Sequence, residues 1–338
     1  MKIRGVLVAG AAAGLLVLAG CSTSGDSSSS DSGSSGDSTT SADSGGSSGG
    51  GGGNIRIDVI THGAPGDSFW DVVKSGAEQA GKDEGVDLKY QSDPDVGKQA
   101  TLIDNAVAAG TDGLVVSMAN PDGLQSSIKD AISKGVPVIT INSGIDQWKD
   151  FGAITHVGQS EDLAGQAAGE QMNEAGISKA LCVIQEAGNV GLEQRCAGAA
   201  KTFDGKLTNL QVDNTDLSGS EATIESKIQS DSSIDGILSL GGDMSGQVVK
   251  AIDNTGASIK AGTFDVNADV VQNIVDGKLL FAIDQQPYVQ GYLGVTGIYL
   301  KVLNGNDIGG GQPVYSGPAI ITKDNAADVL KFAQNGTR

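Results

Sequence analysis

From Asn54 onward the sequence alternates short runs of β-branched and apolar residues with stretches that have the apolar spacing of a helix. The expected strands are residues 55–60, 88–91, 113–117, 136–141, 180–185, 234–240, 261–264 and 280–284. The expected helices begin at Phe69 and continue over 96–109, 123–134, 162–175, 248–254 and 289–303. Such alternation produces parallel sheets covered by helices on both faces, so the predicted fold class is α/β.

The first expected helix shows the pattern most clearly. Its apolar stripe, at i, i+3, i+4, i+7, i+8 and i+11, consists of Phe69, Val72, Val73, Gly76, Ala77 and Ala80. Ser68 and Asp71 have capping-box spacing, which predicts that the helix begins there. Trp70 falls off the stripe, and a large aromatic side chain at a loop mouth favours stacking on a ligand.

The length of 338 residues exceeds what one hydrophobic core usually supports, so two domains are expected. A weak internal repeat agrees with this expectation, because the hexapeptide DGLVVS at 112–117 is similar to DGILSL at 235–240. Two similar α/β lobes would explain both observations.

The N-terminus has the layout of a signal peptide. Lys2 and Arg4 precede an apolar run over 5–20, which is shorter than the roughly 20 residues that span a bilayer. The run ends in Leu-Ala-Gly-Cys, which resembles a bacterial lipobox with Cys21 as the lipidated first residue of the mature chain. Residues 1–20 are therefore expected to be a lipoprotein signal peptide. The Ser/Gly-rich residues 21–53 are expected to be a disordered tether.

Charge and composition exclude several classes of protein. The chain has 22 Lys and Arg against 41 Asp and Glu, a formal charge of -19, which argues against nucleic acid as a partner. Two histidines, His62 and His156, and three cysteines without zinc spacing predict neither a metal site nor a cofactor. Cys182 and Cys196 fall in an expected strand and the helix after it. In an exported protein a disulfide between them is expected.

Polar and aromatic residues gather directly after the expected strands. In parallel sheets the carboxyl ends of the strands carry the ligand site. The loops after these strands cover 61–70, 117–122, 142–144, 186–195, 241–245, 265–267 and 285–288. Their Asp, Asn, Gln and aromatic side chains suit a polyhydroxylated molecule, because they accept from or donate to hydroxyls and cover C–H surfaces.

Several motifs in these loops carry a resemblance to a known family. They are DSFW at 67–70, GVPVITIN at 135–142, EQRCAG at 193–198, TFD at 263–265, DGKL at 276–279 and IDQQP at 283–287. With them the chain resembles the ribose/galactose-type periplasmic sugar-binding proteins of ABC importers. The resemblance implies a type I periplasmic-binding fold, two Rossmann-like lobes joined by three hinge crossovers. The N-terminal lobe would be residues 54–157 plus 286–315, and the C-terminal lobe 158–285 plus 316–338.

The resemblance also implies a set of ligand contacts from both lobes and the hinge. They are Asp67, Phe69, Trp70, Asn142, Arg195, Asp265 and Gln285, and His62 lies in a loop that should overhang the cleft. Each position has a plainer interpretation. Asp67 could only cap the helix, Phe69 and Trp70 could be core, and Arg195 could pair with Glu193 or Glu186. Asp265 could be a turn residue, Asn142 and Gln285 hinge packing, and His62 a solvated loop residue.

The chain departs from the ribose binders at several of these positions. Asp67 stands where they carry Asn, Asn142-Ser143 where they carry Asp-Arg, and Gly241-Gly242 where they carry Asn-Asp. The loss of a guanidinium at Ser143 removes a strong donor, so we expect another pentose, a hexose or a polyol rather than ribose.

The predicted function is an extracytoplasmic solute-binding lipoprotein without enzymatic activity. It would be a monomer that captures a small neutral sugar by lobe closure and delivers it to ABC permease subunits. Cys21 would anchor it to the bilayer of the cell membrane. An alternative is a sensory receptor of the same fold for a sugar or a furanosyl signal. An exported sugar-modifying enzyme is disfavoured, because no Ser/His/Asp order or metal motif falls in the post-strand loops.

Overall fold

The structure is a computed structural model that describes residues 55–338. The predicted leader, Cys21 and the predicted tether lie outside the described residues. Between residues 55 and 338 no helix is both long and apolar enough to span a bilayer.

The first lobe is built on a fully parallel sheet with strand order β11-β5-β4-β3-β1-β2. Its strands are β1 (Arg56–Thr61), β2 (Asp87–Ser92), β3 (Gly113–Ser117), β4 (Val138–Ile141), β5 (His156–Gly158) and β11 (Val314–Tyr315). Its helices are α1 (Ser68–Glu84), α2 (Val96–Ala108), α3 (Pro121–Ser133), α4 (Trp148–Phe151), α10 (Pro287–Asn304) and the short η1 (Gly309–Gly311).

The second lobe repeats this plan with strand order β12-β10-β9-β8-β6-β7, in which only β12 runs antiparallel. Its strands are β6 (Lys179–Ile184), β7 (Lys206–Gln211), β8 (Gly236–Ser239), β9 (Lys260–Phe264), β10 (Phe281–Asp284) and β12 (Ala319–Thr322). Its helices are α5 (Glu161–Glu174), α6 (Val190–Thr202), α7 (Leu217–Ser230), α8 (Gly242–Thr255), α9 (Ala268–Val275) and α11 (Ala326–Gln334).

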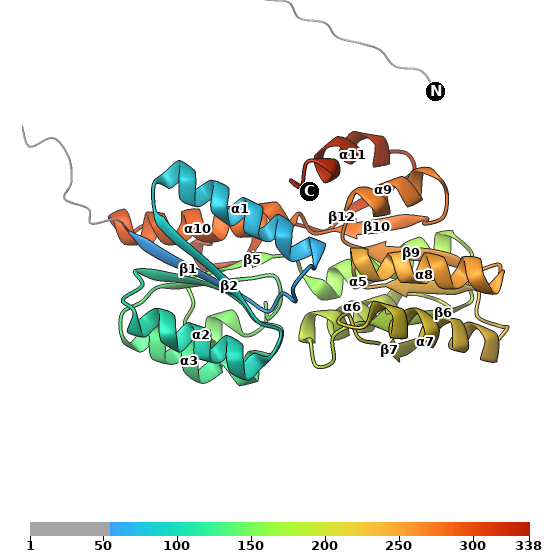
Figure 1. Ribbon diagram of the computed structural model, residues 1–338, viewed down its shortest axis with the longest axis horizontal. Coiled ribbons are helices and arrows are strands. Elements are labelled where there is room, and N and C mark those ends of the chain that lie inside the picture. Colours follow the sequence, from blue (N-terminus) through green and yellow to red (C-terminus); the bar gives the residue numbers. More distant parts are fainter. Residues whose placement is uncertain (1–54) are drawn as a thin grey trace, which may run out of the picture. The chain divides into compact units, whose positions relative to one another are not determined.

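Helices cover both faces of each sheet, as the sequence predicts (Figure 1). In the first lobe α1 and α10 pack on one face, and α2, α3 and α4 pack on the other. In the second lobe α5 and α6 cover one face, and α7, α8, α9 and α11 the opposite one. The chain passes between the sheets after β5, after β10 and between β11 and β12. The two-lobed α/β fold class is thereby confirmed.

Helices α1 and α10 lie in very close contact, although they come from opposite ends of the body. A Cβ at Gly76 would overlap the carbonyl oxygen of Tyr288, and a Cβ at Gly291 would overlap that of Val73. Glycine is therefore needed at both positions for the backbones to approach. This contact fixes α1, whose N-terminus carries part of the site described below.

The two similar hexapeptides, 112–117 and 235–240, occupy equivalent positions in the two sheets. Strands β3 and β8 each lie between the first strand and the fourth strand of their lobe. Asp112, before β3, accepts a hydrogen bond from the backbone N of Arg56 at 2.8 Å. Asp235, before β8, accepts one from the backbone N of Lys179 at 2.7 Å. Each aspartate thus fixes the start of the neighbouring strand.

Strand β7 is one of the elements that the sequence analysis did not predict. Strand β7 reads KLTNLQ and lies at an exposed edge of its sheet, so it has no buried apolar run. The start of α1 also differs from the prediction, because its cap is Asp67 and not Ser68. Trp70 is buried on the inner face of α1, whereas Phe69 is only half-buried. The predicted stripe was wrong at this end of the helix.

Cys182 in β6 and Cys196 in α6 form a disulfide, with their Cα atoms 6.0 Å apart. Both side chains are buried in the core that α5 and α6 make with the sheet. The bridge therefore fixes α6, and with it Arg195, against the second sheet.

Replacing both cysteines with alanine should lower the free energy of unfolding by about 3 kcal/mol, because the bridge closes a short loop in the unfolded chain. Urea denaturation of the wild type, the double variant and the wild type under reducing conditions measures this. The reduced wild type should match the double variant. Equal midpoints for all three samples would contradict the prediction.

Candidate functional site

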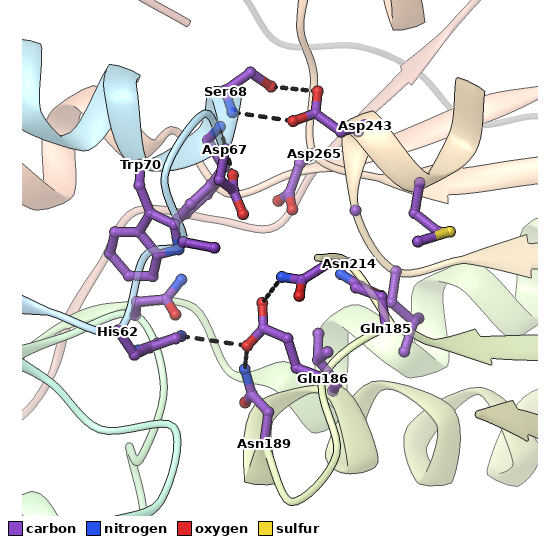
Figure 2. A pocket seen from close by; sticks show the side chains of 18 of the residues that line it. His62, Asp67, Ser68, Trp70, Gln185, Glu186, Asn189, Asn214, Asp243 and Asp265 are labelled. Carbon is purple, nitrogen blue, oxygen red and sulfur yellow. Dashed lines mark hydrogen bonds and ion pairs between the residues drawn. The ribbon is translucent and has the colours of Figure 1, made fainter. Parts of the chain in front are cut away.

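A cavity of about 320 Å³ lies between the two lobes at the carboxyl ends of both sheets (Figure 2). Its volume is in the range of small-molecule sites, about 300–1,000 Å³. Every predicted ligand-contact residue lines it, namely His62, Asp67, Phe69, Trp70, Asn142, Arg195, Asp265 and Gln285. The position of these residues directly after strands explains why the fold brings them together.

A chain of amide and carboxylate groups crosses the cavity from one lobe to the other. The Nδ2 of Asn142 donates to Oε1 of Gln285 at 3.0 Å, and the Nε2 of Gln285 donates to Oδ1 of Asp265 at 2.7 Å. Asn142 and Asp265 directly follow β4 and β9 and have left-handed backbones, with φ of 65° and 63°. Such conformations are sparsely populated for residues with a side chain and cluster at functional sites.

Arg195 is 3% exposed and forms a two-pronged ion pair with Glu161. Its Nε lies 2.6 Å from Oε2, and its Nη2 lies 3.0 Å from Oε1. Nη1 donates to the carbonyl of Leu240 at 2.9 Å and lies 3.7 Å from Oδ2 of Asp265. Burial alone lowers the pKa of Arg195, but Glu161 and Asp265 raise it, so the guanidinium stays charged.

This geometry changes the prediction for Arg195. Pairing with Glu193 or Glu186 is wrong, because the partner is Glu161 at the start of α5. Most of the guanidinium donors face protein groups, and only Nη1 approaches Asp265 and the cavity. Removal of Arg195 would also leave Glu161 buried without its counter-ion, which is strongly destabilising. Arg195→Ala is therefore expected to destabilise the fold as well as to change the site.

The first-lobe wall consists of the loop after β1 and the start of α1. Asp67 caps α1, accepting from the backbone N of Phe69 at 3.0 Å, and also lines the cavity. Trp70 packs edge-on against His62, with ring centroids 4.6 Å apart. His62 is not solvated, because it is 6% exposed and its Nδ1 lies 2.7 Å from Oγ of Ser117.

The sequence analysis did not single out several lining residues of the second lobe. They are Gln185, Glu186, Asn189, Asn214 and Asp243. Glu186 accepts from Nδ2 of Asn189 at 2.7 Å and from Nδ2 of Asn214 at 3.1 Å, and it lies 3.8 Å from Nε2 of His62 (Figure 2). Most of them fall in loops expected after strands. Asn214 follows β7, a strand that the sequence analysis did not predict.

Ser68 and Asp243 join the two lobes at the edge of the cavity. The backbone N of Ser68 donates to Oδ2 of Asp243 at 3.0 Å, and its Oγ donates to Oδ1 at 2.7 Å (Figure 2). Asn267 also donates to Asp243 Oδ1, at 3.1 Å. We call Ser68 and Asp243 the clasp. Elsewhere the backbone N of Val190 donates to the carbonyl of Ala119 at 3.0 Å, again between lobes.

The cavity is acidic. Burial, together with the nearby charges of Glu186 and Asp243, raises the pKa of Asp67 to about 7. Burial also raises the pKa of Asp265 to about 7, although Arg195 opposes the rise. Burial lowers the pKa of His62, so its imidazole is neutral. The site therefore repels anions and presents oxygen acceptors. In the part of the chain that the structure describes, no cluster of side chains is arranged to hold a metal ion.

Two α/β lobes, three connecting segments and a partly open cavity between the lobes define a two-lobed ligand-binding protein. Residues 57–307 match the family described as periplasmic binding protein domain, and the chain belongs to this family. The resemblance to periplasmic sugar-binding proteins is confirmed.

Two curated relatives and one solved structure show the extent of the similarity. A xylose/arabinose-binding protein of Sulfolobus acidocaldarius is 27% identical over 65% of this chain, and the match spans only 60% of that relative. A ribose import binding protein of Bacillus subtilis is 23% identical over 67% of this chain and 74% of the relative. A carbohydrate transporter from Acidothermus cellulolyticus 11B, solved with myo-inositol, is 44% identical. It covers 85% of this chain and 100% of its own, with a TM-score of 0.83.

Asp243→Ala should speed ligand release, because the clasp stabilises only the closed arrangement of the lobes. We expect a larger dissociation rate constant and a nearly unchanged association rate constant, measured by stopped-flow with the tryptophan signal of Trp70. Asp269→Ala is the control, since Asp269 is an exposed acidic residue in the first turn of α9. Equal dissociation rates in both variants would contradict the role of the clasp.

In the ligand-free protein, the fraction of molecules with closed lobes should fall as the pH rises from about 4 to about 7. The raised pKa values of Asp67 and Asp265 mean that the closed form binds protons that solvated carboxyls with pKa near 3.8 would release. The lowered pKa of His62 acts in the opposite sense, but only below its usual 6.5, so the two carboxyls act alone above that pH.

Small-angle scattering of the ligand-free protein measures this effect. The radius of gyration should be smaller at pH 5 than at pH 8. The double variant Asp67→Asn with Asp265→Asn should show little change, and asparagine keeps the helix cap. A wild-type radius that does not change with pH, or a change that persists in the double variant, would contradict the assignment.

Proposed function

We propose that this protein is the extracytoplasmic solute-binding component of an ABC importer and that its ligand is a small neutral polyol, with myo-inositol the first candidate. The observation that carries the proposal is the acidic cavity enclosed by both lobes. It places carboxylate oxygens of Asp67 and Asp265 on opposite walls, while Arg195 is already paired with Glu161.

The chemistry of the cavity favours hydroxyl groups over other ligand groups. A hydroxyl donates to a carboxylate and still accepts from an amide or indole N–H, so each one can satisfy two groups of the wall. A carboxylate or phosphate on the ligand would face Asp67, Glu186 and Asp265, and Arg195, the one Lys or Arg among the described lining residues, is already paired with Glu161. The Acidothermus cellulolyticus relative, which is 44% identical, was solved with myo-inositol, and this similarity supports a cyclic polyol.

Binding would proceed by closure of the lobes on the ligand. A polyol held by Asp67 and Trp70 of the first lobe gains its bonds to Asp265 only when the second lobe approaches. Its affinity for the closed form then exceeds that for the open form, and this difference shifts the population. We infer that the permease recognises the closed lobes. The protein needs no covalent chemistry for this role and is proposed to be non-enzymatic.

The proposal includes export and anchoring. The leader over 1–20 and the lipobox cysteine Cys21 support a lipoprotein held at the cell membrane, with residues 21–53 as a tether to the binding body.

Isothermal titration of residues 54–338 with myo-inositol, D-ribose, D-xylose and D-glucuronate tests the ligand class. We expect heat with myo-inositol or another neutral compound and none with the anion. Asp265→Ala should weaken binding more than tenfold, since a buried charge-assisted bond to ligand is lost, about 1.5–3 kcal/mol. Asp269→Ala is the exposed control. Binding of glucuronate alone, or wild-type affinity of Asp265→Ala, would contradict the proposal.

A further inference from the structure

Gln185 has a buried side chain in the cavity wall, and among the described residues its amide group has no hydrogen-bond partner. It directly follows β6 and is 9% exposed. Among the described residues, its Oε1 has no hydrogen-bond partner. Gln285, on the other side of the cavity, differs, because its amide is bonded to both Asn142 and Asp265. This oxygen is closed off from the cavity as well as from solvent, so the group of Gln185 that a bound ligand can reach is its Nε2.

The backbone of Gln185 is held in place while its side chain is not. The backbone N of Asn214 donates to the carbonyl of Gln185 at 3.0 Å, which ties the ends of β6 and β7 together. Glu186, the next residue, is held by the amides of Asn189 and Asn214. Figure 2 shows Gln185 beside Glu186 and Asn214 on the second-lobe wall. The side chain of Gln185 is thus carried on a backbone that is fixed in position.

Gly241 provides the space that this amide occupies. It follows β8, the neighbour of β6, and a Cβ there would lie 2.7 Å from Nε2 of Gln185. The backbone of Gly241 is extended, with φ of -162°, a conformation that any residue adopts. The contact is with the end of a flexible side chain, so glycine at this position keeps the amide of Gln185 where it is and is not required for the backbone fold. Any larger residue would have to displace the amide of Gln185.

We propose that Gln185 binds the ligand directly through its amide and that Gly241 is a specificity-determining position because it makes room for that amide. The inference rests on the proposed function for the ligand class. The rest of the wall is rich in acceptors, from Asp67, Glu186 and Asp265. The Nε2 of Gln185 adds a donor to this wall, which matches a ligand hydroxyl that accepts one hydrogen bond and donates another to a carboxylate.

Titration calorimetry of Gln185→Ala with myo-inositol is the first test. We expect affinity to fall roughly tenfold or more, because the hydrogen bonds to the ligand are lost. Gln147→Ala is the matched control. Gln147 precedes α4 outside the cavity, and its Oε1 also lacks a hydrogen-bond partner within residues 55–338. The control should bind as the wild type does. Circular dichroism and thermal melting of the ligand-free variants establish that both are folded.

Gly241→Ala, made in two backgrounds, tests the space argument. In the wild type it should weaken myo-inositol binding about as much as Gln185→Ala does, because the new methyl group displaces the amide. In the Gln185→Ala background the same substitution should have little further effect, because no amide remains to be displaced. This non-additivity distinguishes a steric effect on Gln185 from general damage at the end of β8.

The outcomes separate the inference from the proposed function. If the wild type binds myo-inositol and Gln185→Ala binds equally well, the inference is wrong and the proposed function stands. Additive losses in the double variant would overturn the role of Gly241. If the wild type binds none of the neutral polyols and sugars, the proposed function fails, and the inference fails with it.

Discussion

The buried ion pair between Arg195 and Glu161 is the contact on which the second-lobe side of the site depends. It joins the start of α5 to α6, and the same guanidinium holds the carbonyl of Leu240 and faces Asp265. The guanidinium also lies over the ring of Phe264, 4.6 Å from its centroid. One charged group therefore fixes the ends of β8 and β9 relative to two helices. Because it is neutralised by Glu161, it adds little positive charge to the cavity.

The remaining carboxylates determine what the cavity accepts and how it closes. Asp67, Glu186, Asp243 and Asp265 face the same enclosed space, and their mutual repulsion opposes closure when it is empty. The clasp between Ser68 and Asp243 works in the other direction. The proposed ligand, with several hydroxyl donors, would satisfy the carboxylates and shift this balance toward closure. A transport receptor needs this difference, in which the closed form is sparsely populated without ligand and dominant with it.

Much of the fold and part of the site could be predicted from local patterns. Strands such as β3 and β8 are continuous apolar runs, which the sequence shows directly. Asn142 and Asp265 each follow a strand directly, and the carboxyl ends of the strands in both sheets border the cavity, so both residues line it. Contacts between distant segments could not be predicted. The partner of Arg195 is 34 positions away, and Ser68 meets Asp243 across 175 positions. Asn214 escaped prediction because β7 is an exposed edge strand without an apolar signal.

A crystal structure of the protein with myo-inositol would test the central claim most directly. The account predicts one ring in the cavity, with hydroxyl oxygens within hydrogen-bond distance of Asp67 in the first lobe and of Asp265 in the second. A ring bound to one lobe alone, or bound outside the cavity while the cleft stays closed and empty, would contradict it.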